Sequence, residues 1–278
     1  MRPFMQGLRR LALVLAGVLV AGTVANAQVV AFENVNVLPM DHERVLQNQT
    51  VIVRDGKIAE MGPAASVKVP QGATRIAAKG KFLMPGIAEM HGHLPGGPQS
   101  LEDPAFVEQV LFLYIANGVT TVRGMLGTPE NLKHRDEINA GRLLGPKLYV
   151  AGPPLDGRSV ASADDARRVV REQKNAGYDH LKIIGGMSRP NYDVVAQTAK
   201  QLKIDFAGHV PAEVGAIHAM EAGQKSIDHM DGYLEFLGSG VESIDENKIP
   251  ALVSAAVKSG VWTVPTMAVW DHFFSNES

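Results

Sequence analysis

Residues 84–95 read MPGIAEMHGHLP, a short apolar run that ends in a His-Xaa-His pair formed by His91 and His93. Side chains alternate between the two faces of an extended strand, so both imidazoles of such a pair point to the same side. Two neutral imidazoles aimed at one point are good ligands for a divalent metal ion. This stretch therefore predicts a strand that carries a metal-binding pair at its carboxyl end.

Three further nitrogen-bearing side chains follow later apolar runs. Lys182 lies in GYDHLKIIGG, His209 in DFAGHVP and His229 in AGQKSIDHMDGY. Together with His91 and His93 they give five residues at predicted strand ends, and we expect them to surround one centre. Such a ring of nitrogen ligands is typical of a metallohydrolase site.

The sequence from Phe82 onward alternates short apolar strands with helices. Asp103-Pro104, Thr128-Pro129 and a capping box at Ser162 and Asp165 indicate helix starts. Glycines suited to a left-handed backbone indicate helix ends, at Gly118, Gly141, Gly177, Gly223 and Gly260. Strands are expected over 119–122, 147–150, 180–184, 226–228 and 261–264. Alternating βα units imply parallel strands, and the predicted fold is an α/β fold, a (β/α) TIM-type barrel.

The predicted barrel is incomplete at its C-terminus. Seven strands can be counted, and their ends fall at or near His91 and His93, Arg123, Ala151, Lys182, His209, His229 and, for a seventh strand over Trp262–Val269, Val269. A complete barrel has eight strands and about 250 residues. We therefore expect residues 82–278 to hold strands 1–7 only and the rest of the domain to follow Ser278. Active sites of this fold lie at the carboxyl ends of the strands, where the five candidate ligands fall.

Two segments precede the predicted barrel. Residues 1–27 read as a signal peptide, in which basic residues come before the apolar stretch Leu11–Val24 and an Ala-Xaa-Ala cleavage pattern ends at Ala27. A membrane anchor is the alternative, but the apolar stretch is shorter than the ~20 residues that span a bilayer. We expect cleavage, export to the periplasm or the extracellular space, and no stable membrane anchor afterwards.

Residues 28–81 show short strand patterns broken by turns. Asp55-Gly56, between Gln49–Val53 and Lys57–Met61, is a strong signal for a β-hairpin. We expect these residues to form the N-terminal portion of a small β-sandwich.

The composition excludes several classes of protein. The chain has 278 residues, of which 45% are hydrophobic and 20% charged, so it can bury a sizeable core. Its net charge of −2 becomes more negative without the basic leader, which argues against nucleic-acid binding. The absence of cysteine excludes thiolate metal ligands. A small-molecule substrate is the expected partner, and the sequence leaves open whether the chain forms a homo-oligomer.

These residues also carry a family resemblance, which runs from about Val29 to Trp270. The stretches GKFLMPGIAEMHGH, NGVTTVRGMLG, LKIIGG with FAGHVP, and EAGQKSIDHMDG resemble the amidohydrolase superfamily, above all its secreted imidazolonepropionase-like and prolidase-like members. The resemblance implies a metal-dependent hydrolase with two divalent metal ions, zinc in the first place and manganese or cobalt as alternatives. It also implies that the N-terminal strands pair with strands returning from the C-terminus.

The resemblance assigns a role to each of the five residues. It implies that His91 and His93 bind one metal ion, that His209 and His229 bind the second, and that a carboxylated Lys182 bridges the two. An ammonium ion beside two cations would be repelled, whereas a neutral buried amine can take up CO2 and become an anionic carbamate. The two ions, ~3.5–4 Å apart, would share a hydroxide that attacks a carbonyl group.

The catalytic acid/base of the family is an aspartate at the end of strand 8, and this sequence has no match for it. Asp271, just after the seventh predicted strand, is the only nearby carboxylate in sequence, and we do not assign it the role. Arg123 can meet a substrate carboxylate through its bidentate guanidinium, or form a salt bridge at the rim of the barrel. Tyr233, after His229, is a second candidate for substrate binding, with Asp231 nearby.

The predicted function is hydrolysis of a carbon–nitrogen bond in an amide or dipeptide-like substrate. A lactonase or esterase of the same superfamily is one alternative, because the same site would polarise an ester carbonyl. A catalytically inactive metal-binding fragment that lacks the strand-8 aspartate is the other.

Overall fold

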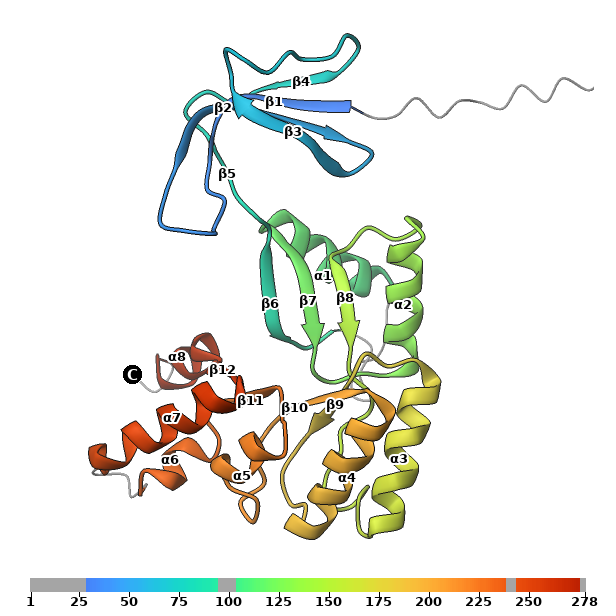
Figure 1. The fold of residues 1–278 in the computed structure, drawn as a ribbon. Coiled ribbons are helices and arrows are strands. Elements are labelled where there is room, and N and C mark those ends of the chain that lie inside the picture. Colours follow the sequence, from blue (N-terminus) through green and yellow to red (C-terminus); the bar gives the residue numbers. More distant parts are fainter. Residues whose placement is uncertain (1–28, 95–103, 239–243, 276–278) are drawn as a thin grey trace, which may run out of the picture. The chain divides into compact units, whose positions relative to one another are not determined.

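The computed structural model describes residues 29–94, 104–238 and 244–275. They fall into two compact units, with the division between Pro85 and Gly86 (Figure 1). The predicted signal peptide, residues 1–27, and Asp103, the expected cap of the first helix, lie outside the described residues. No helix within the described ranges is long and apolar enough to cross a membrane.

The first unit is a five-stranded sheet around β1 (Val29–Val37). β1 pairs antiparallel with β2 (Leu46–Arg54) and parallel with β4 (Thr74–Ala77) and β5 (Phe82–Leu83), while β3 (Lys57–Pro63) pairs antiparallel with β2. The described residues of this unit form one sheet and include no second layer. The β-sandwich therefore stays a prediction.

The hairpin predicted at Asp55-Gly56 is confirmed. Arg54 pairs with Lys57, and the two turn residues have φ values of 51° and 74°. Two consecutive positive φ angles are what a type I′ turn requires, and the twist of this turn matches that of the flanking strands.

The described residues of the second unit form seven parallel strands in chain order. β6 (Ile87–Gly92), β7 (Val119–Gly124) and β8 (Lys147–Val150) form one sheet, and β9 (His180–Ile183), β10 (Asp205–Gly208), β11 (Ser226–Asp228) and β12 (Trp262–Val264) form another. Parallel bridges from Ala151 to His180 and from Leu155 to Ile183 continue this order across the two sheets. Among the described strands, β6 and β12 do not pair, so the structure shows a parallel α/β unit, and closure into a barrel remains a prediction.

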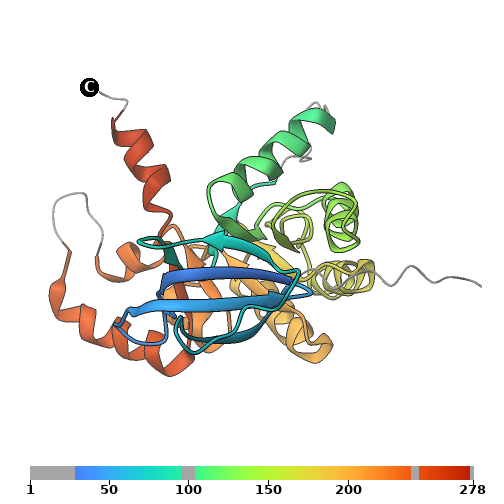
Figure 2. The same cartoon turned by 90° about the horizontal axis from the view of Figure 1, so that it is seen from above.

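Helices connect these strands and lie around them (Figure 2). They are α1 (Pro104–Ala116), α2 (Pro129–Asn139), α3 (Ala163–Ala176), α4 (Arg189–Leu202), α5 (Ala216–Glu221), α6 (Tyr233–Phe236), α7 (Ile249–Ser259) and α8 (Met267–Ser275), with a 3₁₀ turn at Glu246–Lys248. The main core packs α3 and α4 against β9 and β10, with Leu181, Ile183, Tyr192, Val195 and Phe206 fully or almost fully buried.

The helix signals read from the sequence are confirmed for α3. The Ser162 hydroxyl accepts a hydrogen bond from the Asp165 N–H (3.1 Å), and Gly177 ends the helix in the left-handed conformation (φ 87°). Both features satisfy backbone groups that a helix end leaves unpaired.

Helix α4 was not expected from the sequence, and one strand boundary differs from the structure. Helix α4 has no glycine signal, because Lys203 takes the left-handed position after it (φ 52°). The seventh strand was expected over 261–264 and, in the count of barrel strands, over Trp262–Val269; the shorter range is confirmed, and the extension to Val269 is wrong. β12 ends at Val264, since Pro265 cannot donate to a strand ladder and Thr266 has a left-handed backbone (φ 51°).

We expect Lys203→Gly to raise the free energy of unfolding of the second unit by about 1 kcal/mol, because glycine adopts the left-handed conformation without a steric clash. The Lys203 side chain is exposed, and its carbonyl would still accept from Lys174 Nζ (3.1 Å). Every described helix belongs to this unit, so the helical circular dichroism signal during urea denaturation reports it. An unchanged or lower free energy would contradict strain at this position.

Candidate metal centre

His91 and His93 lie at the end of β6 with their ring nitrogens close together. Nε2 of His93 is 3.3 Å from Nε2 of His91, and Nδ1 of His91 donates to Asp228 Oδ2 (2.8 Å). Asp228 has a pKa of about 2, so its carboxylate is ionised and can only accept. His91 therefore carries its proton on Nδ1, and the lone pair of its Nε2 faces His93.

His209 and His229 continue this row. They follow β10 and β11 directly, and their ring centroids are 4.7 Å apart, while those of His229 and His91 are 4.5 Å apart. Nδ1 of His209 is 2.6 Å from Asp231 Oδ2, and Nδ1 of His229 is 2.7 Å from Thr266 Oγ1. The structure thus brings together all four histidines that the sequence singled out.

Burial favours the neutral form of two of the imidazoles, those of His229 and His93. Burial, with smaller contributions from the neighbouring imidazoles of His91 and His209 and from Lys182, lowers the pKa of His229 to about 4. Burial is also the main reason why the pKa of His93 is below its usual value. Neutral imidazoles are the form that binds metal.

Lys182 lies on β9 and is 2% exposed. Its Nζ has no hydrogen-bond partner among the described residues and is 3.8 Å from Asp228 Oδ2, too far for a hydrogen bond. Burial lowers the pKa of Lys182 to about 8. The charge of Asp228 acts to raise this pKa, and the charge of Arg123 lowers it further. A neutral amine is therefore accessible near neutral pH, as carbamate formation requires.

The space for the Lys182 side chain depends on Gly208, the residue before His209. Gly208 has φ 123°, and a Cβ there would lie 2.5 Å from the Ile183 carbonyl oxygen and 2.8 Å from Lys182 Cδ. Only glycine fits this conformation and this close approach. The glycine in FAGHVP is thus what lets the lysine and the histidine of adjacent strands lie side by side.

Asp228 is the main residue of this site that the sequence analysis missed. Burial alone would raise its pKa, but the hydrogen bonds from His91 and Ser226 and the charges of Lys182 and Arg123 lower it. The Ser226 hydroxyl donates to Asp228 Oδ1 (2.7 Å), and both residues are fully buried. The signal was present in the sequence, because a serine and an aspartate alternate on a short buried strand just before a candidate ligand.

The two candidates for substrate binding are engaged inside the protein. Arg123 Nε donates to the Met90 carbonyl (2.8 Å), and its Nη2 donates to Ser226 Oγ (2.9 Å) and lies 3.5 Å from Asp228 Oδ1. These contacts match the alternative in which Arg123 forms a salt bridge instead of binding a substrate carboxylate. Tyr233 is buried, and its hydroxyl is 2.9 Å from Thr263 Oγ1. A substrate role for either residue stays a prediction.

The chemistry of these residues fits the predicted metal site. Two nitrogens that are each about 2.0–2.1 Å from one tetrahedral ion are about 3.3–3.4 Å apart, and the nitrogens of His91 and His93 are 3.3 Å apart. In the part of the chain that the structure describes, no group of three or more His, Asp or Glu side chains is arranged to hold a metal ion. The predicted site needs only two imidazoles for each ion, with Lys182 as the shared ligand.

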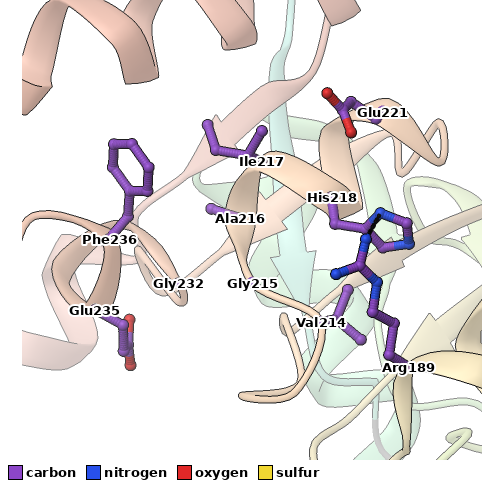
Figure 3. Close-up of a pocket in the computed structure, with 10 residues that line it drawn as sticks. All are labelled: Arg189, Val214, Gly215, Ala216, Ile217, His218, Glu221, Gly232, Glu235 and Phe236. Atoms are coloured by element: carbon purple, nitrogen blue, oxygen red, sulfur yellow. Dashed lines mark hydrogen bonds between the residues drawn. The ribbon is translucent and has the colours of Figure 1, made fainter.

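A pocket of about 520 Å³ is lined by the short helices α5 and α6 with the residues just before them, and by Arg189 at the start of α4 (Figure 3). Arg189 Nη2 lies 2.9 Å from His218 Nδ1 in this pocket, and His218 Nε2 lies 2.5 Å from Asp193 Oδ1. None of the five candidate ligands lines it, so it is a separate feature from the row of imidazoles.

The fold and the site define a parallel α/β protein with histidines at the carboxyl ends of its strands. No family model matches the chain. It is 28% identical over 207 residues to an adenine deaminase of Paracoccus denitrificans, covering 66% of this chain and 33% of that protein. It is 24% identical over 255 residues to an ochratoxinase of Aspergillus niger, covering 69% of this chain and 52% of that protein.

Solved structures show the same fold. The A. niger ochratoxinase structure matches with a TM-score of 0.69 and 20% identity, covering 91% of this chain and 68% of the other. A Xaa-Pro dipeptidase structure with bound methionine matches with a TM-score of 0.68 and 18% identity, covering 88% and 68%. The names of other similar proteins, among them an imidazolonepropionase and a bottromycin amidohydrolase, agree with the resemblance to the amidohydrolase superfamily. The chain spans between a third and about half of the length of the two sequence relatives described above.

The buried His180 makes the metal-free protein sensitive to acid. Burial lowers its pKa to about 4 from the usual 6.5, so between these pH values the unfolded chain binds a proton that the folded chain does not. Its stabilising contribution is full above pH 6.5 and is lost as the pH falls through 4. We expect His180→Leu to flatten the fall in unfolding free energy over this window by roughly 3 kcal/mol. Parallel curves for variant and parent in urea denaturation would contradict this.

Proposed function

We propose that this chain acts as a metal-dependent hydrolase that cleaves a carbon–nitrogen bond in an amide or dipeptide-like substrate. One observation carries the proposal. Four imidazoles follow one another with ring centroids 4.5–5.2 Å apart, and three of them have Nδ1 engaged by a partner, which leaves Nε2 available. The buried amine of Lys182 lies 3.8 Å from Asp228 Oδ2, the same oxygen that accepts from His91.

Each pair of histidines would bind one of two metal ions. His91 and His93 would hold one divalent ion, His209 and His229 the second, and Lys182 as a carbamate would bridge them, with zinc as the expected metal. Bound ions of this kind lower the pKa of a water molecule, which supplies the attacking hydroxide, and polarise the carbonyl oxygen under attack. The proposed function is thus distributed over four strand ends, β6, β9, β10 and β11.

The remaining residues position these ligands. Asp228 and Asp231 accept from the Nδ1 atoms of His91 and His209, which fixes the ring orientation and increases the basicity of Nε2. Asp228 also lies next to the Arg123 guanidinium and the Lys182 amine in the interior. The imidazoles are therefore oriented by contacts within the chain.

The names of the similar proteins support the type of bond. A deaminase and a Xaa-Pro dipeptidase are named for the cleavage of carbon–nitrogen bonds. The composition of residues 1–27 supports export, so the substrate would be met in the periplasm or outside the cell.

The first test combines metal content with turnover. We expect the protein to bind up to two zinc ions per chain and to hydrolyse members of a panel of dipeptides and N-acyl amino acids. The double variant His91→Ala, His93→Ala should lose one ion and at least 100-fold in turnover, because one ion then lacks both of its imidazoles. His42→Ala, which changes an exposed histidine of the first unit, is the control.

Each outcome of this test has a defined reading. Turnover confined to a parallel panel of lactones would replace the amide proposal with the lactonase alternative. Zinc binding without turnover on either panel would support a metal-binding protein that is not itself an enzyme. Equal zinc content in the double variant and the parent would refute the assignment of the His-Xaa-His pair.

A second test concerns the bridging lysine. We expect Lys182→Ala to weaken zinc binding at least 10-fold, and added acetate to restore part of it, because a small carboxylate can take the place of the carbamate. Lys225→Ala is a matched control, since Lys225 precedes β11 and its side chain is exposed. With ¹³C-labelled bicarbonate, the zinc-loaded parent should show a carbamate signal by NMR, and its absence would rule out the bridge.

A further inference from the structure

Thr266 occupies an unusual position beside His229. It follows Pro265 at the end of β12, and its backbone is left-handed (φ 51°). A β-branched residue in this region is an outlier that costs about 1–3 kcal/mol unless the surrounding structure imposes it. Here a neighbouring hydrogen bond, from the His229 N–H to the Val264 carbonyl (3.0 Å), ties the two segments together.

The hydroxyl of Thr266 has a defined direction. It donates to the Pro265 carbonyl (2.7 Å), and its Oγ1 lies 2.7 Å from Nδ1 of His229. A hydroxyl has one proton, and when that proton is donated to the carbonyl, Oγ1 accepts from the imidazole. In this arrangement Nδ1 of His229 carries the ring proton, and Nε2 carries the lone pair.

We propose that Thr266 is a positioning residue that holds His229 in its Nδ1–H tautomer, with the Nε2 lone pair free to bind a metal ion. Asp228 and Asp231 act in the same way on His91 and His209, but they are carboxylates, which accept only. A threonine could donate or accept, and the Pro265 carbonyl removes that choice. The strained backbone is what places Oγ1 between carbonyl and imidazole. This inference rests on the proposed metal site.

Three variants of Thr266 separate its possible roles. Thr266→Val keeps the branched shape and loses the hydroxyl, Thr266→Ser keeps the hydroxyl, and Thr266→Gly loses the hydroxyl while relieving the left-handed strain. Lys203→Gly is the matched control, because it relieves strain at another left-handed residue away from the site.

The first measurement is ¹⁵N NMR of the His229 ring in the metal-free protein, where protonated and unprotonated ring nitrogens have different shifts. We expect one Nδ1–H tautomer in the parent and in Thr266→Ser, and a mixture in Thr266→Val and Thr266→Gly. The second measurement is the affinity for Co²⁺, followed by its visible absorption. Affinity should fall 10–100-fold in Thr266→Val and Thr266→Gly, and less than about threefold in Thr266→Ser and Lys203→Gly.

The glycine variant is decisive against a purely structural role. If Thr266 mattered only for the fold, relief of strain would leave Co²⁺ affinity unchanged or improve it, whereas we expect a more stable protein that binds the ion less tightly. A single Nδ1–H tautomer and parental affinity in both Thr266→Val and Thr266→Gly would overturn the proposal. Loss of the tautomer in these variants, in a parent that binds no metal, would uphold the role of Thr266 and refute the proposed function.

Discussion

The ionised carboxylate of Asp228 is the constraint on which the second unit depends. It is fully buried and contacts residues of four different strands: His91 on β6, Arg123 on β7, Lys182 on β9 and Ser226 on β11. A buried charge is tolerated only when it is paired and hydrogen-bonded, and removing one partner of a buried pair typically costs about 3–5 kcal/mol. These contacts therefore favour the strand register that brings the four groups to the carboxylate.

A second polar contact holds the strand ends that carry His209 and His229. The Gln224 side chain donates to the carbonyls of Gly208 (3.1 Å) and Ser226 (2.9 Å), and it accepts from the Tyr192 hydroxyl (2.6 Å). Because β11 is only three residues long, its ladder alone gives little rigidity. The buried amide supplies the missing bonds between β10 and β11. It thereby limits the movement of the two imidazoles at their ends.

Much of the site could be predicted from the sequence, because strand ends are local features. A histidine after a short apolar run is visible without any tertiary contact, and parallel strands bring such ends together. The sequence alone could not decide between substrate binding and a salt bridge for Arg123, because only the fold shows that Asp228 lies beside its guanidinium. Helix α4 and the end of β12 were missed because non-glycine residues, Lys203 and Thr266, adopt left-handed conformations there. A threonine or a lysine in the sequence does not indicate a left-handed backbone, because the surrounding structure imposes that conformation.

These contacts also bear on the order in which the site is built. In small zinc domains the metal supplies the folding energy, because the ligands have no other partners. Here the orientation of His91 depends on Asp228 and that of His209 on Asp231, and both bonds exist without any ion. Asp228 meanwhile lies next to both Lys182 and Arg123, so its own buried charge is paired in the metal-free interior. Because three of the four imidazoles have a partner within the chain, folding and metal binding can be separate events, and an entering ion would meet three imidazoles that are already oriented.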